Sequence, residues 1–294
     1  MSRRGWILFL LTGLLWGIPY LFIKVAVDPD NGFTPAIVVC LRTAIGAAIL
    51  IPWSIHQGSL GAAFRGIKYV APYALLEMIG PWILIGTAEQ KISSGLAGLL
   101  IASVPIWATI FASLKGDKTV WHRKRLFGLV LGFIGLIFVV GVESIKGSSD
   151  PLSIAMVLVA AVGYSYAVMF VQSGLPGVSG VAINAVAMLI TSLFYAPFAF
   201  HQWPSHSISS SAIWSVIGLG VLSTGAAFAI FFALTPIIGV ARASLVTYLN
   251  TAFAVVLGVI ILSEPLTIGI ILGLPLVLIG SYYASRKSEV SSDA

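Results

Sequence analysis

The chain has 294 residues, of which 59% are hydrophobic and only 9% are charged, and its formal net charge is +6. A soluble globular domain carries about 25% charged residues, so this chain has too few charges to cover a surface that faces water. The composition excludes a soluble domain and predicts an all-α integral membrane protein.

The first apolar stretch directly follows the N-terminal residues "MSRR". It continues for roughly 21 residues, whereas the apolar region of a signal peptide has about 7–15, and no small-x-small cleavage site closes it. The sequence therefore predicts a first transmembrane helix over residues 6–26 rather than a cleaved signal.

The rest of the chain divides at polar or turn-rich points into further apolar segments. A helix that crosses a hydrocarbon core of about 30 Å needs roughly 20 mostly apolar residues. With the first segment included, ten spans are predicted: 6–26, 33–55, 69–88, 93–115, 126–142, 151–173, 178–200, 211–235, 240–262 and 266–285. The break between Glu89 and Ser93 is very short.

The distribution of lysine and arginine predicts the orientation, because these residues accumulate in cytoplasmic loops. With the N-terminus in the cytoplasm, only Lys24, Lys91 and Lys146 fall outside, Arg42 lies within a span, and the other basic residues fall inside. An odd number of helices would place the basic C-terminal "SRKSEV" outside. We therefore predict that both termini are cytoplasmic and that residues 287–294 form a short disordered tail. The positive charge indicates this topology, and no nucleic-acid partner is expected.

The two halves of the chain resemble each other at a nearly constant offset. The segment "WGIPY" (16–20) matches "VGYSY" (162–166), and "AGLL" (97–100) matches "ASLV" (243–246), both 146 residues further on. Five helices per half is an odd number, so the second half would enter the membrane from the opposite side. Such inverted repeats are typical of secondary transporters, which bind their substrate between the halves.

Four stretches resemble the EamA-type ten-helix members of the drug/metabolite transporter superfamily. They are "GLLWGIPYLFIKVA" (13–26), "CLRTAIGAAIL" (40–50), "AEQKISSGLAGLLIASVPIWATIFA" (88–112) and "LNTAFAVVLGVIILSEPLTIGIILGLPLVLIG" (249–280). Arg42 and the pair Glu264-Pro265 stand at positions where this family usually has the same residues, although the first half has no Glu-Pro pair. The resemblance implies two EamA-type five-helix repeats, expected at 1–145 and 150–286.

The resemblance also implies a function. We expect a secondary transporter in the plasma (cell inner) membrane that exports a small metabolite, such as an amino acid or a related solute, by alternating access. The alternatives are a facilitative uniporter or exchanger without ion coupling, an integral-membrane enzyme, and a channel. The sequence has no cluster of acids and histidines and no metal-ligand spacing, so no enzyme activity, metal or cofactor is expected. The expected partners are the lipid bilayer, a small-molecule substrate and, as open alternatives, protons and a second copy of the chain.

Two ionisable residues, Arg42 and Glu77, lie well inside the predicted spans. A charge at the bilayer centre is costly, so both side chains should face the protein interior or a wet cavity. Either Arg42 pairs with Glu77 or caps backbone carbonyls and so locks two helices together, or Arg42 lines the cavity and holds an anionic group. Glu77 is the candidate for proton coupling, because a carboxyl group without a partner in hydrocarbon must exchange its charge for a proton.

A metabolite cavity also needs uncharged polar and aromatic groups. Two asparagines at mid-membrane depth, Asn184 and Asn250, either line the cavity or join neighbouring helices. The aromatic residues at this depth either contact the cargo or serve only in packing. The complete set of cavity candidates is Trp16, Tyr20, Arg42, Glu77, Trp82, Trp107, Tyr166, Asn184, Tyr248 and Asn250.

Overall fold

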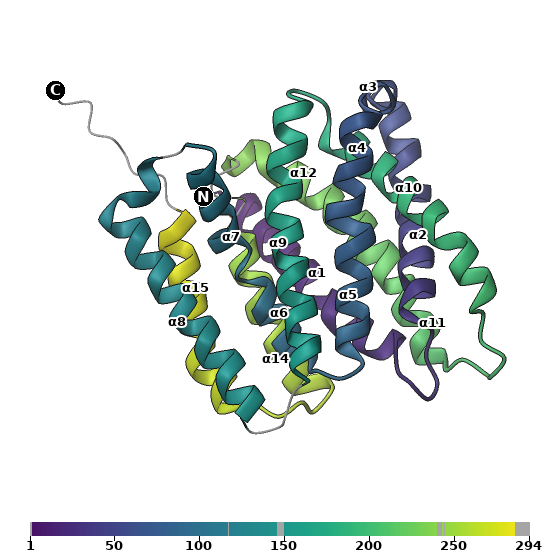
Figure 1. Ribbon diagram of the computed structural model, residues 1–294. Coiled ribbons are helices and arrows are strands. Elements are labelled where there is room, and N and C mark those ends of the chain that lie inside the picture. The colour runs from purple at the N-terminus through teal and green to yellow at the C-terminus, as the bar shows by residue number, and fades with distance from the viewer. Residues whose placement is uncertain (1, 117, 146–149, 240–242, 244, 286–294) are drawn as a thin grey trace.

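The computed structural model describes residues 2–116, 118–145, 150–239, 243 and 245–285 (Figure 1). At residues 119, 120, 139–145 and 285 it describes the backbone alone. Within these residues every regular element is a helix and there is no strand. The predicted tail, 287–294, lies outside the described residues.

The helices follow the predicted apolar segments closely. Their bounds are α1 (Arg3–Ala26), α2 (Pro35–His56), α3 (Leu60–Arg65), α4 (Ile67–Ala74), η1 (Leu75–Ile79), α5 (Gly80–Glu89), α6 (Ser94–Ile101), α7 (Val104–Leu114), η2 (Lys118–Trp121), α8 (Arg123–Ile145), α9 (Pro151–Gly174), α10 (Gly180–His201), α11 (Ser210–Gly220), η3 (Val221–Ala226), α12 (Ala227–Ile238), α14 (Val246–Ile261) and α15 (Ile268–Ser285).

Seven helical segments within the described residues are long and apolar enough to cross a membrane. Three of them combine shorter elements: α4 to α5, α6 to α7, and α11 to α12. The shorter helices α14 and α15 are apolar as well. The chain is therefore an all-helical, multi-pass membrane protein, while the count of ten spans and the cytoplasmic termini stay predictions.

Consecutive segments run up and down through the bundle, so their connections gather at two faces (Figure 1). We call the face at which α1 begins the N face and the other the opposite face. At the N face, the Ser179 hydroxyl donates to Gln57 Oε1 at 3.5 Å. At the opposite face, the Ser209 amide donates to the Asn31 carbonyl at 3.0 Å. These contacts each join connections from the two halves of the chain.

The start of α9 at the opposite face is fixed by Asp150. This carboxylate accepts hydrogen bonds from the Ser153 hydroxyl at 2.8 Å and from the Ser153 amide at 3.0 Å. These bonds hold the pKa of Asp150 below its usual range, so the cap is present at neutral pH and is lost only as the pH falls through that lowered pKa. Lys91 lies 3.7 Å away, an exposed ion pair that adds little.

The packing of the two halves is reciprocal. Helix α1 packs against α11 and α14, and its counterpart in the second half, α9, packs against α5, α6 and α7. Helix α2 packs against α10, and α8 against α15. The contacts α2–α10 and α8–α15 join equivalent helices of the two halves. The contacts of α1 with the second half are matched by contacts of α9 with the first half, as a two-fold relation between the halves requires.

Two membrane-spanning segments contain a π-helical turn, one in each half. The first is η1 (Leu75–Ile79) and the second is η3 (Val221–Ala226). Their first residues are 146 positions apart, which is the offset that the sequence repeat predicts. Such turns loosen the helical ladder and occur frequently at functional sites.

Glycines allow α8 and α15 to lie in direct backbone contact along one side of the bundle (Figure 1). A Cβ atom placed on Gly280 would lie 2.5 Å from Gly132 Cα and 2.8 Å from Gly128 O. Both of those atoms are backbone and cannot give way as a flexible side chain could. The close approach of these two helices therefore depends on small residues.

Replacing Gly280 by valine should separate α8 from α15 and lower stability by about 1–3 kcal/mol, as overpacking of a tight contact does. Thermal unfolding in detergent should show this as a clearly lower apparent Tm. Gly61→Val is the matched control, because a Cβ at Gly61 meets only the end of the Arg65 side chain at 3.7 Å. Equal Tm values for the two variants would contradict the helix contact.

Candidate functional site

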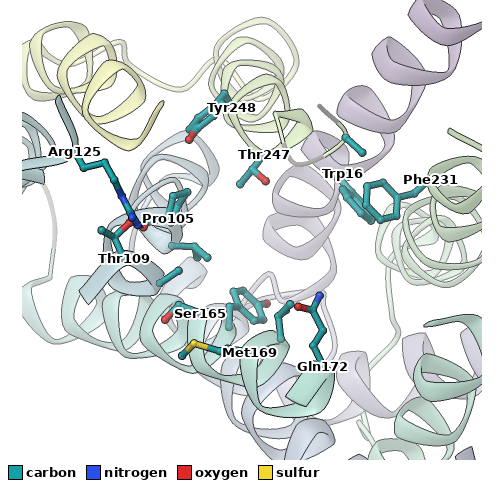
Figure 2. Close-up of a pocket in the computed structure, with 15 residues that line it drawn as sticks. Trp16, Pro105, Thr109, Arg125, Ser165, Met169, Gln172, Phe231, Thr247 and Tyr248 are labelled. Atoms are coloured by element: carbon teal, nitrogen blue, oxygen red, sulfur yellow. The ribbon is translucent and has the colours of Figure 1, made fainter. Parts of the chain in front are cut away.

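A cavity of about 480 Å³ lies between the two halves of the bundle (Figure 2). Helices α1, α7 and α8 of the first half and α9, α12 and α14 of the second half contribute side chains to it. Its lining residues are Trp16, Val104, Pro105, Ala108, Thr109, Arg125, Tyr164, Ser165, Val168, Met169, Gln172, Phe231, Ala243, Thr247 and Tyr248. This volume is within the range of pockets that hold small organic molecules.

The cavity occupies the half of the bundle next to the N face. Gln172 lies two residues before the end of α9, and Arg125 is the third residue of α8. Trp16 and Tyr164 are among the deepest residues, and at about 1.5 Å per residue they lie roughly 15–20 Å from the N-face ends of their helices. The cavity thus extends to about the middle of the membrane.

Aromatic, apolar and uncharged polar groups share the cavity wall. Figure 2 shows Trp16 and Phe231 against each other on one side, with ring centroids 4.7 Å apart. Ser165 and Gln172 project from α9 opposite Thr247 of α14. Among the described lining residues there is no aspartate or glutamate. Such a wall suits an amphipathic small molecule that is neutral or anionic.

Arg125 brings the single charge found among the described lining residues. Its side chain is buried, with 7% exposure, and extends toward Thr109 (Figure 2). Arg125 Nε and the Thr109 hydroxyl both donate to the Ala284 carbonyl, each at 3.2 Å. The guanidinium therefore ties α8 to the end of α15 while it adds positive charge at the cavity rim.

Of the ten predicted cavity candidates, Trp16 and Tyr248 line this cavity. Most of the others have partners that account for their positions. Asn184 accepts a hydrogen bond from the Tyr73 hydroxyl at 3.1 Å and donates to the Gly180 carbonyl at 2.9 Å. It joins helices, which is the second of its two predicted roles.

Four aromatic candidates lie outside the wall, and three of them are held by neighbouring side chains. Trp107 donates to Ser103 Oγ at 3.1 Å. Tyr166 packs against Phe111, with ring centroids 5.4 Å apart. Tyr20 is 7% exposed and belongs to the main hydrophobic cluster.

Asn250, the remaining amide candidate, accepts a hydrogen bond from the Thr251 hydroxyl at 3.3 Å. It lies on α14 but is absent from the described wall of the cavity.

Arg42 is buried at the junction of the halves, away from the cavity wall. Its Nε donates to Thr224 Oγ1 at 3.2 Å, and its guanidinium carbon lies 3.8 Å from the centroid of the Trp82 ring. No ion pair within 4.0 Å joins it to Glu77 among the described residues. The Arg42 cation is thus surrounded by a hydroxyl and an aromatic ring, whereas pairing with the Glu77 carboxylate was one of the predictions.

Glu77 lies in the π-helical turn η1, where its Oε2 is buried and accepts no hydrogen bond from any described residue. Thr224, which holds Arg42, lies in the second π-helical turn, η3. Tyr164 of the cavity wall is within electrostatic range of Glu77, Arg42 and Tyr20. The cavity therefore ends at a group of polar residues that both π-helical turns help to form.

The half of the bundle next to the opposite face is closed by contacts between the chain halves. Glu264 follows α14, and its carboxylate accepts hydrogen bonds from the Ser94 amide (2.7 Å), the Ser94 hydroxyl (2.9 Å) and the Gly95 amide (3.1 Å). It thereby caps the N-terminus of α6, where a negative charge is favoured. We call this closure, together with Lys24 and Ile92 beside it, the seal.

Several residues of the site carry no clear signal in the sequence. Tyr164 and Ser165 are neighbours of the predicted Tyr166, but helical geometry turns Tyr166 away from the cavity. Arg125 reads as an ordinary cytoplasmic charge. Glu89 stands at a very short predicted break, yet its side chain is 0% exposed. The sequence predicts only two deeply placed ionisable residues, Arg42 and Glu77. The structure shows that Glu89 is fully buried as well.

Comparison with known proteins agrees with this architecture. The EamA-like transporter family matches residues 3–141 and again 151–286. The chain belongs to the EamA-like transporter family. Members of this family are transporters, which makes transport the class of activity to explain and places the protein in a membrane.

Individual relatives that are also described as transporters match this chain over nearly their whole length. The "Uncharacterized transporter YoaV" of Bacillus subtilis (strain 168) is 28% identical and covers 92% of this chain and 92% of its own. An "Uncharacterized transporter" of Archaeoglobus fulgidus is 26% identical over 97% of this chain and 99% of its own. A solved crystal structure, 17% identical, has a TM-score of 0.64 over 97% of both chains, a likeness of fold alone.

We expect Arg42→Lys to destabilise the protein, because an ammonium cannot both lie flat on Trp82 and donate to Thr224 as a guanidinium does. The loss should be about 1–3 kcal/mol, the sum of a stacked cation and a buried hydrogen bond. Thermal unfolding in detergent measures it, with Arg4→Lys at the exposed N-terminus as the control. An unchanged Tm combined with lost cargo affinity would instead give Arg42 a direct role in binding.

Proposed function

We propose that this EamA-like protein is a secondary transporter of the plasma (cell inner) membrane that moves a small metabolite by alternating access. The observation that carries the proposal is the cavity between the two halves, which reaches the middle of the bundle from the N face and stops there. Beyond it, Glu264 and its partners close the path. One open side and one closed side describe a single state of an alternating-access cycle.

The direction of transport follows from the predicted orientation. If the N face is cytoplasmic, the described conformation is open to the cytoplasm and receives cargo from there, as export requires. The inverted relation of the halves supplies the second state, because the reciprocal packing permits the bundle to close at the N face and open at the other. We assign both repeats, 1–145 and 150–286, to this exchange.

The wall of the cavity limits the cargo. Trp16, Phe231 and Tyr248 offer aromatic surface, and Ser165, Gln172 and Thr247 offer hydrogen-bonding groups. Arg125 adds positive charge near the entrance. Amino acids and related solutes, which combine a carboxylate with a small side chain, match this mixture.

Flux into proteoliposomes tests the proposal. A panel of labelled amino acids should include at least one with saturable uptake or efflux, with the internal pH recorded at the same time. Flux that rises linearly with concentration for every solute would contradict a carrier, and so would flux that persists when the cavity is filled. Proton movement that accompanies the flux would separate a coupled transporter from a facilitator.

Filling the cavity should stop transport without unfolding the protein. Ala108→Trp places an indole in the wall and should lower the maximal flux at least about tenfold, because cargo must bind there before the bundle changes state. Leu114→Trp, on the same helix α7 but 78% exposed, is the matched control and should transport normally. Equal flux in the two variants would place the pathway elsewhere.

A further inference from the structure

Glu89 is the most deeply buried acidic side chain of the described protein, and it lies outside the described wall of the cavity. It is the last residue of α5, is 0% exposed, and neither of its carboxyl oxygens accepts a hydrogen bond from any described residue. Buried carboxylates in proteins are ordinarily paired or hydrogen-bonded. An ionised Glu89 would therefore be a buried charge without a hydrogen-bond partner among the described residues.

The nearest cation does not neutralise it through a hydrogen bond. Lys24 Nζ donates to the main-chain carbonyl of Glu89 at 2.6 Å and to that of Ile92 at 2.9 Å. Its ammonium thus caps the end of α5 and holds the turn that leads to α6. The carboxyl group of Glu89 is left buried beneath this contact.

Four titratable or charged groups from the surrounding elements lie within electrostatic range of Glu89. Tyr20 and Lys24 come from α1, Arg42 from α2, and Glu264 from the turn after α14. The two cations are occupied by carbonyls and by Thr224, and Glu264 caps α6. Lys24, Arg42 and Glu264 each have a partner of their own, whereas the Glu89 carboxyl has none among the described residues.

Glu89 is also part of the seal. It stands five residues before Ser94, the residue that Glu264 holds, and the intervening turn carries Ile92 beneath Lys24. Opening the opposite face requires α1, the α5–α6 turn and the α14–α15 turn to separate. The same movement brings water to the Glu89 carboxyl.

We propose that Glu89 is the proton-binding group of this transporter: it carries a proton while the opposite face is sealed and releases it to water on that side when the seal opens. Binding a proton neutralises the Glu89 carboxylate, so no negative charge is left buried without a partner. This inference rests on the proposed alternating-access function and moves the coupling role from Glu77 to Glu89. Acidifying the medium at the opposite face then favours the sealed state.

The size of the effect follows from linkage. If closing the seal binds one proton, the ratio of sealed to open molecules changes at most about tenfold per pH unit. A Glu89→Gln side chain is neutral at every pH and of the same shape, so it should keep the seal closed and remove the pH dependence.

Distances across the opposite face test this directly. A pair of spin labels at Asn31→Cys and Leu266→Cys, both exposed and on different connections, reports separation of α1–α2 from α14–α15 in the full-length protein in nanodiscs. The native Cys40 is buried and is replaced by serine in every sample. The parent protein should show a short distance at acidic pH and a growing long-distance population as the pH rises.

Two matched variants decide between the acids. With Glu89→Gln the short distance should persist at all pH values, whereas Glu77→Gln should respond to pH as its parent does. The proposal is overturned if Glu77→Gln loses the response and Glu89→Gln keeps it, or if the parent shows no response. It is equally overturned if sodium ions close the seal at constant pH.

Infrared spectroscopy of the Glu77→Gln protein gives a second measurement that does not depend on the folding of Glu89→Gln. The carbonyl band of a protonated carboxylic acid should rise and fall together with the short-distance population. A sealed protein whose acids are all ionised would overturn the proposal. Saturable cargo flux that persists in that case would leave the transport function intact, whereas the absence of saturable flux in the parent would contradict the function itself.

Discussion

A polar group inside a lipid bilayer has no water to bond, and this constraint organises the whole protein. Hydroxyl groups such as Thr12, Thr43 and Thr191 donate to carbonyls one helical turn earlier, at 2.7–2.8 Å. Arg42 satisfies the same constraint with Thr224 and the face of Trp82. Exceptions are therefore informative: Glu77 Oε2 in the π-helical turn η1 and both carboxyl oxygens of Glu89 in the seal have no hydrogen-bond partner among the described residues.

The cavity and the seal are built on the same helices. Helix α1 contributes Trp16 to the cavity and Lys24 to the seal, and α14 contributes Thr247 to the cavity while the turn after it carries Glu264. In the proposed cycle, a rotation of one half against the other would loosen one region as it tightens the other. This shared construction would give the proposed alternating access a mechanical basis. It would also make the exposure to water of the proposed proton-binding group, Glu89, depend on the state of the seal.

Composition and the lengths of apolar runs predict most of the fold, because the bilayer fixes both the polarity and the length of a spanning helix. The family resemblance is confirmed by a match over both halves. The sequence predicts how deeply a residue lies in the bundle better than it predicts which way the side chain points. Arg42 is buried as expected, but Tyr164 and Ser165, not Tyr166, face the cavity. Glu89 was missed because its five-residue break looks like a loop, whereas Lys24 and the neighbouring helices cover it.

Alternating access is the central claim, and the accessibility of one cavity residue tests it most directly. Ser165→Cys, in a protein whose native Cys40 is replaced by serine, places a thiol in the cavity wall. In oriented vesicles a membrane-impermeant thiol reagent should reach it from the N face in one state and from the opposite face in the other, with cargo changing the balance. Modification from the N face alone under every condition, or from both faces at once through an open path, would contradict the account.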